Sequence, residues 1–178
     1  MYEIEIKILD IDREKVEEKL FSLGARKIFD EEIHAIYYDS ADNAIRKDRK
    51  TFRLRKEGKR SVLTFKCYIE NTKAKVREEK EVEVADFGIM RSILESAGFS
   101  MWLEMKKHRT TYECEGIHFE IDKYHDKYDY IPEFLEIEGT NIEKIYKYVE
   151  LLGFQKDDCR PWDAIQVAEY YLKRMQSY

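Results

Sequence analysis

The stretch at residues 2–8 reads YEIEIKI and alternates apolar with charged side chains throughout. Successive side chains of a β-strand point to opposite faces, so this stretch predicts a strand with one apolar face and one charged face. The charged face carries Glu3, Glu5 and Lys7. A polar face turned into a protein interior costs folding energy and is usually retained to bind a ligand.

The same pattern, a Glu-x-Glu strand followed by an amphipathic helix and a glycine, occurs three times. The copies are Glu3-Ile4-Glu5 with Gly24, Glu81-Val82-Glu83 with Gly98, and Glu136-Ile137-Glu138 with Gly153. One such pair is typical of a solvated strand face, because carboxylates are mostly exposed. Three pairs on strands of one sheet predict charged faces that converge on a polar cavity.

Length and composition indicate one globular domain over residues 1–178. The chain is 43% hydrophobic and 39% charged, and its apolar periodicity continues from end to end, which excludes a disordered chain. The net charge of −5 argues against a nucleic-acid partner. Any site for a polyanion must therefore be a local concentration of Lys and Arg.

The three cysteines, Cys67, Cys114 and Cys159, are odd in number and widely spaced. This predicts free thiols in a reducing compartment rather than a disulfide framework. The sequence has no apolar run long enough to span a bilayer, and charges begin at Glu3. We therefore expect a cytoplasmic protein with no membrane partner.

Alternation and turn residues predict eight strands, at 2–8, 33–39, 51–56, 61–66, 75–84, 101–114, 117–123 and 134–138. Four helices are predicted, at 13–23, after Asp86, after Asn141, and from Asp163 to about residue 174. The second helix is expected to bury Ile89, Ile93, Leu94 and Ala97. Together these elements predict an α+β fold, a single-domain eight-stranded antiparallel β-barrel with helices packed outside.

Basic side chains follow the same alternation as the carboxylates. The groups that share a strand face are Arg53 with Arg55, Lys107 with Arg109, and Arg77 with Glu79 and Glu81, while Lys66 ends a further strand. Like charges this close repel one another unless counter-charges, a metal or a ligand neutralise them. Because like charges share a face on many strands, the pattern as a whole indicates a ligand more strongly than any single strand does.

A tube with one cationic wall and one carboxylate wall would suit a metal–triphosphate complex. Arg and Lys bind phosphate oxygens, and Mg²⁺ prefers carboxylate and phosphate oxygens. The chain contains no glycine-rich phosphate loop, so side chains must bind the phosphates. Its four histidines show no spacing typical of metal ligands and are expected at the surface or behind the site.

Residues 3–7, Glu-Ile-Glu-Ile-Lys, match the Glu-x-Glu-x-Lys signature of the CYTH superfamily, the triphosphate tunnel metalloenzymes. The resemblance covers nearly the whole chain. The other matching segments, in the family order, are Tyr37-Tyr38-Asp39, Arg53-Leu54-Arg55, Leu63-Thr64-Phe65-Lys66, Arg77-Glu78-Glu79-Lys80-Glu81, Lys107-His108-Arg109, Asp122 and Glu136-Ile137-Glu138. Glu83 falls outside the family pattern.

The resemblance implies an eight-stranded antiparallel tunnel that contains Mg²⁺ or Mn²⁺. The residues it implies for binding the triphosphate are Lys7, Arg53, Arg55, Lys66, Arg77, Lys107 and Arg109. Those it implies for holding the metal are Glu3, Glu5, Glu79, Glu81, Asp122, Glu136 and Glu138. In thiamine triphosphatase relatives a tyrosine and a lysine are assigned to catalysis, and Tyr37 and Lys66 stand at the corresponding positions. Lys7 is a further catalytic candidate.

The superfamily contains two chemistries. Class IV adenylyl cyclases join the ribose 3′-hydroxyl of ATP to its α-phosphate and release pyrophosphate. Triphosphatases direct water at the terminal phosphate of inorganic triphosphate, thiamine triphosphate or a nucleotide. The chain length and residues 34–39 resemble the cyclase branch, so the resemblance implies conversion of ATP to cyclic AMP, with triphosphate hydrolysis as the alternative.

Two further points stay open in the sequence. Residues 160–162, Arg-Pro-Trp, depart from the Ser-Tyr ending of the cyclase branch, so adenine recognition does not follow; Trp162 or the tyrosines at 124–130 could stack on an organic group or simply pack. A non-enzymatic module that binds polyphosphate or a nucleotide would need the cations but not the carboxylates. The resemblance is compatible with a homodimer.

Overall fold

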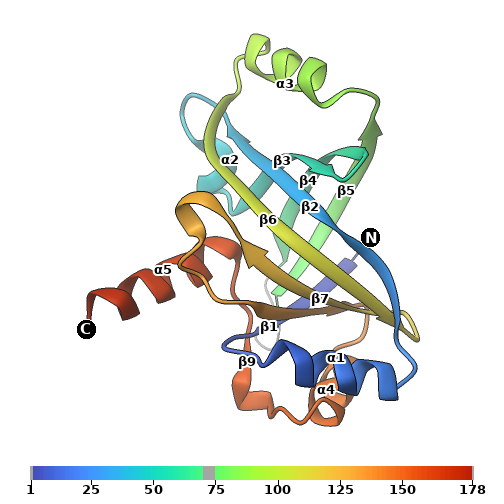
Figure 1. The fold of residues 1–178 in the computed structure, drawn as a ribbon. Helices are drawn as coiled ribbons and strands as arrows, with labels where there is room; N and C mark the ends of the chain where they lie inside the picture. The colour runs from blue at the N-terminus through green and yellow to red at the C-terminus, as the bar shows by residue number, and fades with distance from the viewer. Residues whose placement is uncertain (1, 70–74, 178) are drawn as a thin grey trace.

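A computed structural model describes residues 2–69 and 75–177, with side chains for residues 4–67 and 78–177. In this part of the chain nine strands form one antiparallel sheet (Figure 1). The strands are β1 Tyr2–Ile8, β2 Arg26–Asp39, β3 Lys50–Glu57, β4 Arg60–Ile69, β5 Lys75–Val84, β6 Ser100–Cys114, β7 Ile117–Tyr124, β8 Phe134–Gly139 and β9 Cys159–Arg160.

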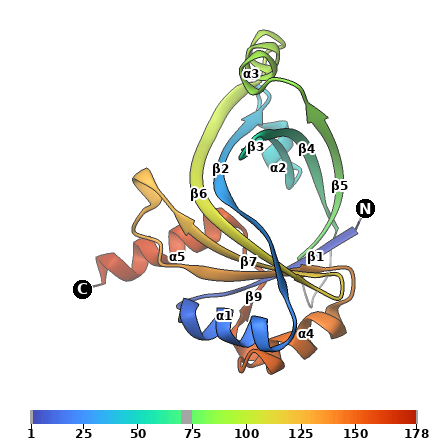
Figure 2. The same cartoon turned by 45° about the vertical axis from the view of Figure 1, so that its right-hand side comes forward.

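The sheet curls until its two ends meet. Its order is β5-β4-β3-β2-β6-β7-β8-β1-β9, and β5 also pairs with β1 through the register from Tyr2↔Glu78 to Glu5↔Lys75. The eight longer strands therefore surround a common interior, which Figure 2 shows between the arch of β2 to β6 and the strands β1 and β7 below it. The α+β fold and the antiparallel tunnel are confirmed, but the sheet has nine strands rather than eight, and only four residue pairs join β5 to β1, so it is a curled sheet rather than a fully closed barrel.

Helices α1 (Arg13–Ser22) and α4 (Ile142–Leu151) cover the outside of β1 and its neighbours, as Figures 1 and 2 show. Asp12 and Asn141 cap them as predicted, each accepting a hydrogen bond from a first-turn backbone N–H. The outer faces of β1, β7 and β8 and the inner faces of these helices form one buried apolar cluster that includes Ile6, Leu20 and Val149. Ile6 and Ile8 of the YEIEIKI stretch thus belong to the core, and Glu5 and Lys7 face the interior of the sheet.

Helix α3 (Phe87–Ser96) differs from the prediction. Leu94 is buried, but Ile89 and Ile93 are 64% and 52% exposed, so the expectation that they face inward was wrong; Ala97 is exposed as well. The helix crosses the far end of the sheet between β5 and β6 (Figure 2). Phe87, Met90 and Leu94 of α3 belong to the apolar cluster that includes Ile36 and Leu54 of the sheet.

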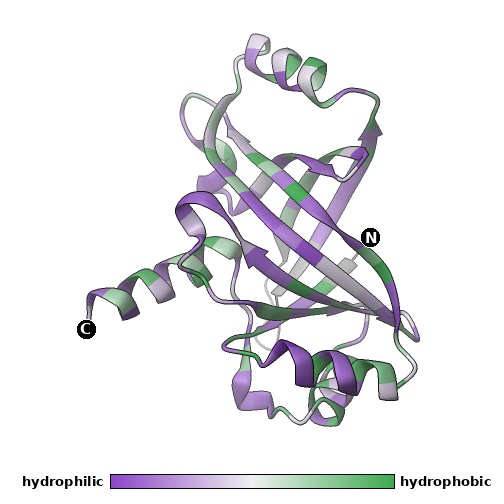
Figure 3. Cartoon of the chain, viewed as in Figure 1, coloured by the Kyte–Doolittle hydropathy of each residue, from purple (hydrophilic) through white to green (hydrophobic). Residues whose placement is uncertain are grey.

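The first residues of β2 and two short elements were not predicted. Strand β2 starts at Arg26 rather than residue 33, because its first residues are exposed on both sides and are held by backbone pairing to β6 rather than by an apolar face. The four-residue helix α2 (Ala44–Lys47) and the two-residue strand β9 are too short to leave a periodic signal. Figure 3 shows the mixed hydropathy of the sheet strands, in contrast to the greener inner sides of α1 and α4.

The last helix, α5 (Ala164–Gln176), begins at the N-cap Asp163, and its capping box pairs Asp163 with Gln166. Val167, Ala168 and Tyr171 bury its inner face, and its C-terminal end projects from the body in Figure 1. Among the described residues no helix is both long and apolar enough to cross a membrane.

A histidine between two carboxylates links β2 to β6 on the outside of the sheet. His108 approaches Asp30 through Nε2 at 2.8 Å and Glu32 through Nδ1 at 2.9 Å. Both carboxylates accept, so the two contacts are satisfied together when both ring nitrogens donate, which favours the imidazolium form. The hydrogen bond to Asp30 chiefly raises the pKa of His108 above its ordinary value of 6.5, against a smaller lowering by burial.

This arrangement predicts a stability that falls at alkaline pH. Because the folded pKa is raised, the contribution of His108 is complete below about pH 6.5 and disappears as the pH rises through the folded value. In urea denaturation, the stability difference between wild type and His108→Gln should be largest near pH 6 and shrink towards pH 9. When Asp30→Asn is also present, the stability difference between the His108 protein and its His108→Gln variant should be smaller. A difference that stays constant from pH 6 to pH 9 would contradict the raised pKa of His108.

Candidate active site

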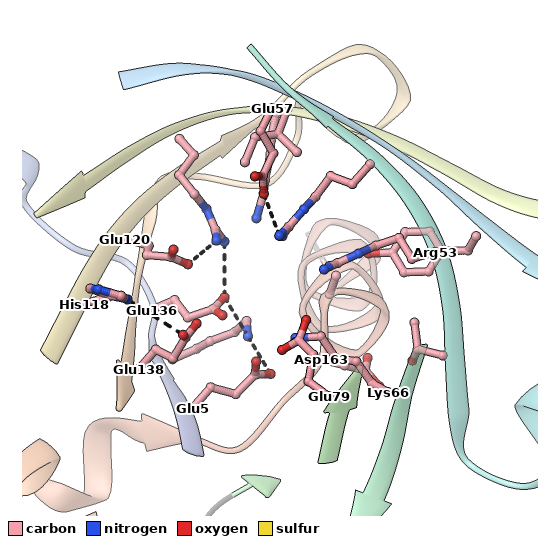
Figure 4. A pocket seen from close by; sticks show the side chains of 18 of the residues that line it. Glu5, Arg53, Glu57, Lys66, Glu79, His118, Glu120, Glu136, Glu138 and Asp163 are labelled. Carbon is pink, nitrogen blue, oxygen red and sulfur yellow. Dashed lines mark hydrogen bonds and ion pairs between the residues drawn. The ribbon is translucent and has the colours of Figure 1, made fainter. Parts of the chain in front are cut away.

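The interior of the sheet is a charged cavity of about 1500 Å³. Side chains from β1 to β8 point into it, together with residues from the segment that leads into α5 (Figure 4). Twelve of the residues expected at the site line it, namely Glu5, Lys7, Tyr37, Arg53, Arg55, Lys66, Glu79, Glu81, Lys107, Arg109, Glu136 and Glu138. The side chains of Glu3 and Arg77 lie outside the described residues, and Asp122 is treated below.

One wall of the cavity is built by β1 and β8, whose register places Lys7 opposite Glu136 and Glu5 opposite Glu138. The Lys7 ammonium lies 2.9 Å from Glu136 Oε2 and 3.3 Å from Glu5 Oε1. Burial lowers the pKa of Lys7, but the two carboxylates outweigh this and hold it above its ordinary value. Lys7 is therefore a buried, permanently charged group, suited to binding an anion rather than to accepting a proton.

Asp122 lies behind the cavity wall and holds two of the predicted phosphate ligands. It is 0% exposed. Its carboxylate accepts from Arg109 Nε at 2.7 Å, from Arg109 Nη2 at 2.6 Å and from Lys107 Nζ at 2.5 Å. Burial would raise the pKa of Asp122, but these two cations lower it below its ordinary value. The geometry gives Asp122 a positioning role for Arg109 and Lys107, and its role as a metal ligand stays a prediction.

Three carboxylates converge on one side of the cavity. Glu120, Glu136 and Glu138 each offer an oxygen within 4.8 Å of the other two. Glu120 also pairs with Arg109 Nη1, and it stands opposite Glu136 in the register of β7 and β8. Burial raises the pKa of Glu120 to about 7, with a further contribution from Glu136 and in spite of Arg109.

This carboxylate group fits a hard divalent cation. Mg²⁺ and Mn²⁺ take oxygen ligands, and Mg²⁺ in particular is held by one or two carboxylates together with substrate phosphates. A cation here would offset the repulsion between Glu120 and Glu136, which adds to burial in raising the pKa of Glu120. Glu120 was missing from the predicted ligand set, although its position beside Asp122 on an alternating strand was the signal that could have found it.

The opposite wall carries the arginines of β3. Arg53 and Arg55 both line the cavity, and Arg55 pairs with Glu57 at 2.5 Å and lies 3.8 Å from Glu81. Burial and the neighbouring Arg53 lower the pKa of Arg55 from its ordinary value. Two guanidinium groups this close on a buried wall form an electrostatic site for an anion.

Besides Lys7, the two other residues expected in catalysis, Tyr37 and Lys66, lie on different strands of the cavity wall. Lys66 of β4 pairs with Glu79 of β5 at 3.1 Å. Tyr37 of β2 packs edge-on against Trp102 of β6, with ring centroids 5.9 Å apart. The structure thus brings both side chains to the cavity; their catalytic roles stay predictions.

The cavity also contains residues that the sequence did not single out. They are Arg46, Arg49, Lys50, Glu57, Arg60, Trp102, His118, Glu120 and Asp163, among others. Arg46, Arg49 and Asp163 lie outside the strands, where no alternation indicates which way a side chain points, whereas the other six lie on strands. His118 lines the cavity, although the histidines were expected at the surface or behind the site. Trp162, considered for stacking on an organic group, packs on Tyr170 at 5.2 Å, and Trp102 lines the cavity instead.

The fold and the cavity define a class of protein. Its members have an antiparallel tunnel in which Lys and Arg side chains contact carboxylates. The profile of the CYTH domain family matches residues 1–157, and the chain belongs to this family. Among curated proteins it is 29% identical over 167 residues to "Putative adenylate cyclase MJ0240" of Methanocaldococcus jannaschii, covering 89% of this chain and 93% of that protein.

Two solved structures illustrate the similarity of the fold. The PH1012 protein of Pyrococcus horikoshii superimposes with a TM-score of 0.78 at 24% identity, covering 93% of this chain and 98% of that one. The adenylyl cyclase-like protein HpAC1 of Hippeastrum, described as having a dominant triphosphatase activity, superimposes with a TM-score of 0.67 at 18% identity, covering 95% of each chain. At these identities the likeness concerns the fold alone.

Proposed function

We propose that this protein is a metal-dependent enzyme that cleaves a phosphoanhydride bond of a triphosphate inside the tunnel. The observation that carries the proposal is the meeting of both charge types in one cavity, Arg53 and Arg55 on one wall and the carboxylates of Glu120, Glu136 and Glu138 on another. A binding site for phosphate alone would need the first set and not the second. Phosphoryl transfer needs both, because it depends on positioning and charge stabilisation.

Each group has a defined task in this proposal. Arg53, Arg55 and Lys66 bind phosphate oxygens, while Lys107 and Arg109 are held in place by Asp122 and bind from the opposite side. Mg²⁺ or Mn²⁺ held by the three clustered glutamates would neutralise charge that develops on the phosphates. Lys7, fixed by Glu136, adds a permanent positive charge on the same side.

The nucleophile defines two candidate reactions. In the cyclase-type reaction, favoured by the relative from Methanocaldococcus jannaschii, the 3′-oxygen of ATP bonds to the α-phosphorus, the bond to the α–β bridging oxygen breaks and pyrophosphate leaves. In hydrolysis, favoured by the activity described for HpAC1, a water oxygen bonds to the terminal phosphorus, the bond from that phosphorus to the β–γ bridging oxygen breaks, and orthophosphate and the diphosphate remainder are released. Substrate orientation in one tunnel decides between them.

Product analysis tests the proposal. The protein is incubated with ATP and with inorganic triphosphate, each with Mg²⁺ or Mn²⁺, and with EDTA as control. Cyclic AMP with pyrophosphate establishes the cyclase, and orthophosphate from either substrate establishes the triphosphatase. If no mixture yields a product, the enzyme proposal is wrong and the non-enzymatic binding module remains.

Binding gives an independent prediction. At a concentration 100 times its Kd, a ligand that binds only the folded state stabilises it by about 2.7 kcal/mol. Inorganic triphosphate with Mg²⁺ should therefore raise the Tm measured by differential scanning fluorimetry by several degrees, and Arg53→Ala should reduce this shift. An unchanged Tm at millimolar triphosphate would contradict a triphosphate site of any kind.

A further inference from the structure

Of the chain's four histidines, all within the described residues, only His118 lines the charged cavity. Each of the other three lies within 3.3 Å of a carboxylate oxygen, namely His34 of Glu104, His108 of Asp30 and His125 of Glu32. His118 Nδ1 is 3.9 Å from Glu138 Oε1, which is beyond hydrogen-bond distance. His118 therefore stands beside a carboxylate without bonding to it.

The inner faces of β7 and β8 place His118 next to Glu120, Glu136 and Glu138, which we call the carboxylate group. In the register of these strands His118 stands opposite Glu138, and Glu120 stands opposite Glu136. Residues two apart on a strand point to the same face, so the four side chains share the inner face of the sheet. Figure 4 shows His118 and Glu138 side by side at the cavity, beside the rest of the carboxylate group.

The spacing of these donor atoms suits one shared ion. An ion whose ligands lie about 2.1 Å away separates neighbouring ligands by about 3 Å and opposite ligands by about 4.2 Å. The 3.9 Å between His118 Nδ1 and Glu138 Oε1 falls between these values, and the oxygens of the carboxylate group lie within 4.8 Å of one another. The His118 side chain is 44% exposed, so it can turn towards an ion without displacing the core.

The cations around the carboxylate group are shared among several carboxylates. They are Lys7, shared by Glu5 and Glu136, and Arg109, shared by Glu120, Asp122 and Glu136. Carboxylates that share a counter-charge still repel one another. A further cation beside His118 would reduce this repulsion.

The type of donor atom decides which cation fits. The metal ligands that the family resemblance implies are all carboxylates, and carboxylate oxygens suit Mg²⁺ as well as Mn²⁺. An imidazole nitrogen is a better ligand for first-row transition cations than for Mg²⁺. On its other side His118 stands opposite Glu113 of β6, and a carboxylate commonly orients a histidine that binds a metal.

We infer that His118 is a nitrogen ligand of the metal at the carboxylate group, and that this site takes a first-row transition cation such as Mn²⁺ or Co²⁺ in preference to Mg²⁺. The inference rests on the proposed function, because it concerns the metal assigned there to the same glutamates. The three glutamates bind the cation from within the cavity, and His118 binds it from the solvent side.

Calorimetric binding of the metals alone tests the preference. Mg²⁺, Mn²⁺ and Co²⁺ are titrated into wild type and His118→Gln. The variant should bind Mn²⁺ and Co²⁺ about 10-fold more weakly or worse, since loss of even an outer partner of a metal ligand costs that much, and its Kd for Mg²⁺ should stay within about 2-fold. The matched control is His34→Gln, at a histidine that pairs with Glu104 and is not part of the cavity lining, and it should leave all three Kd values unchanged.

Pulsed electron paramagnetic resonance of bound Mn²⁺ detects a nitrogen atom in direct contact with the ion. Wild type and His34→Gln should both show this nitrogen coupling, and His118→Gln should lack it. His118→Asp replaces the nitrogen donor by an oxygen donor. This variant should bind Mn²⁺ more tightly than His118→Gln, still lack the coupling, and bring the Kd values for Mg²⁺ and Mn²⁺ closer together than in wild type.

The outcomes distinguish this inference from the proposed function. An unchanged ratio of Mn²⁺ to Mg²⁺ affinity in His118→Gln, or the absence of nitrogen coupling in wild type, overturns the inference. The proposed function survives that result if the protein turns over a triphosphate with either metal. If none of the three cations binds, with or without inorganic triphosphate, the metal-dependent reaction fails and the inference fails with it.

Discussion

Glu136→Gln is expected to lower kcat by about 100-fold or more while the protein still binds triphosphate, because it removes charge at the point where the metal and the phosphates would meet. Glu136 belongs to the carboxylate group with Glu120 and Glu138, and its Oε2 also lies 2.9 Å from Lys7. Glutamine keeps the shape and a hydrogen-bond acceptor but not the charge. The measurement is steady-state turnover with ATP and inorganic triphosphate, paired with calorimetric binding of inorganic triphosphate.

The matched control is Glu83→Gln. Glu83 belongs to one of the three Glu-x-Glu pairs, but its side chain is 66% exposed and pairs with Arg60. Its removal should leave kcat within about 2-fold of wild type, since exposed ion pairs contribute little. If Glu136→Gln retains full turnover, or if the two variants behave alike, the clustered carboxylates are not part of the reaction. If Glu136→Gln abolishes both turnover and triphosphate binding, Glu136 is needed for binding itself and not only for the chemical step.

Asp122→Asn is expected to have the largest effect on stability. The carboxylate is fully buried and neutralises both Arg109 and Lys107, so its loss leaves two cations with less compensation in the interior. Removing one partner of a buried ion pair typically costs 3–5 kcal/mol, and we expect a loss of about 3 kcal/mol because Glu120 and Glu136 still face Arg109. The free energy of unfolding from urea denaturation at pH 7 measures it.

A second substitution separates charge from packing. Adding Lys107→Met to Asp122→Asn removes one of the two undercompensated cations, so the double variant should recover part of the lost stability. A loss below about 1 kcal/mol in the single variant would mean that the neighbouring glutamates already suffice for both cations. A loss that the second substitution deepens would show that the packing around Asp122, and not its charge, is decisive.

The strand faces were readable from the sequence because alternation is a local property. Residues 2–8 predict which side chains of β1 face inward, and the structure places Lys7 and Glu5 in the cavity and Ile6 in the outer core. The hairpin between β6 and β7 was equally local, since Glu115 and Gly116 both have positive φ, as a two-residue turn of this kind requires. The predicted site residues with described side chains, Asp122 apart, reach one cavity for the same reason.

Alternation could not tell apart the roles of residues that share one strand face. Glu120 and Asp122 share a face of β7, yet the register sets Asp122 opposite Arg109 and Glu120 opposite Glu136. The first becomes a buried partner of two cations and the second a member of the carboxylate group. The pair Arg109 and Asp122 follows from the hairpin turn at 115–116, but β7 and β8 are joined by the longer segment 125–133, whose sequence does not fix which residues face each other. The homodimer and the identity of the metal stay predictions.

The sequence by itself determined the strands, the capped helices α1, α4 and α5, and the sign of charge on each inward face, because these depend on neighbours two to four residues apart. The tertiary structure decided where the cavity ends and which side chains line its openings. Asp39 reaches across to hold Arg46 against Trp102, and α5 brings Asp163 and Gln166 to the same opening. The contact between Arg46 and Trp102 and the approach of α5 join residues that are far apart in sequence, so the pairing of β2 with β6 and the packing of α5 decided them, and no local pattern contains them.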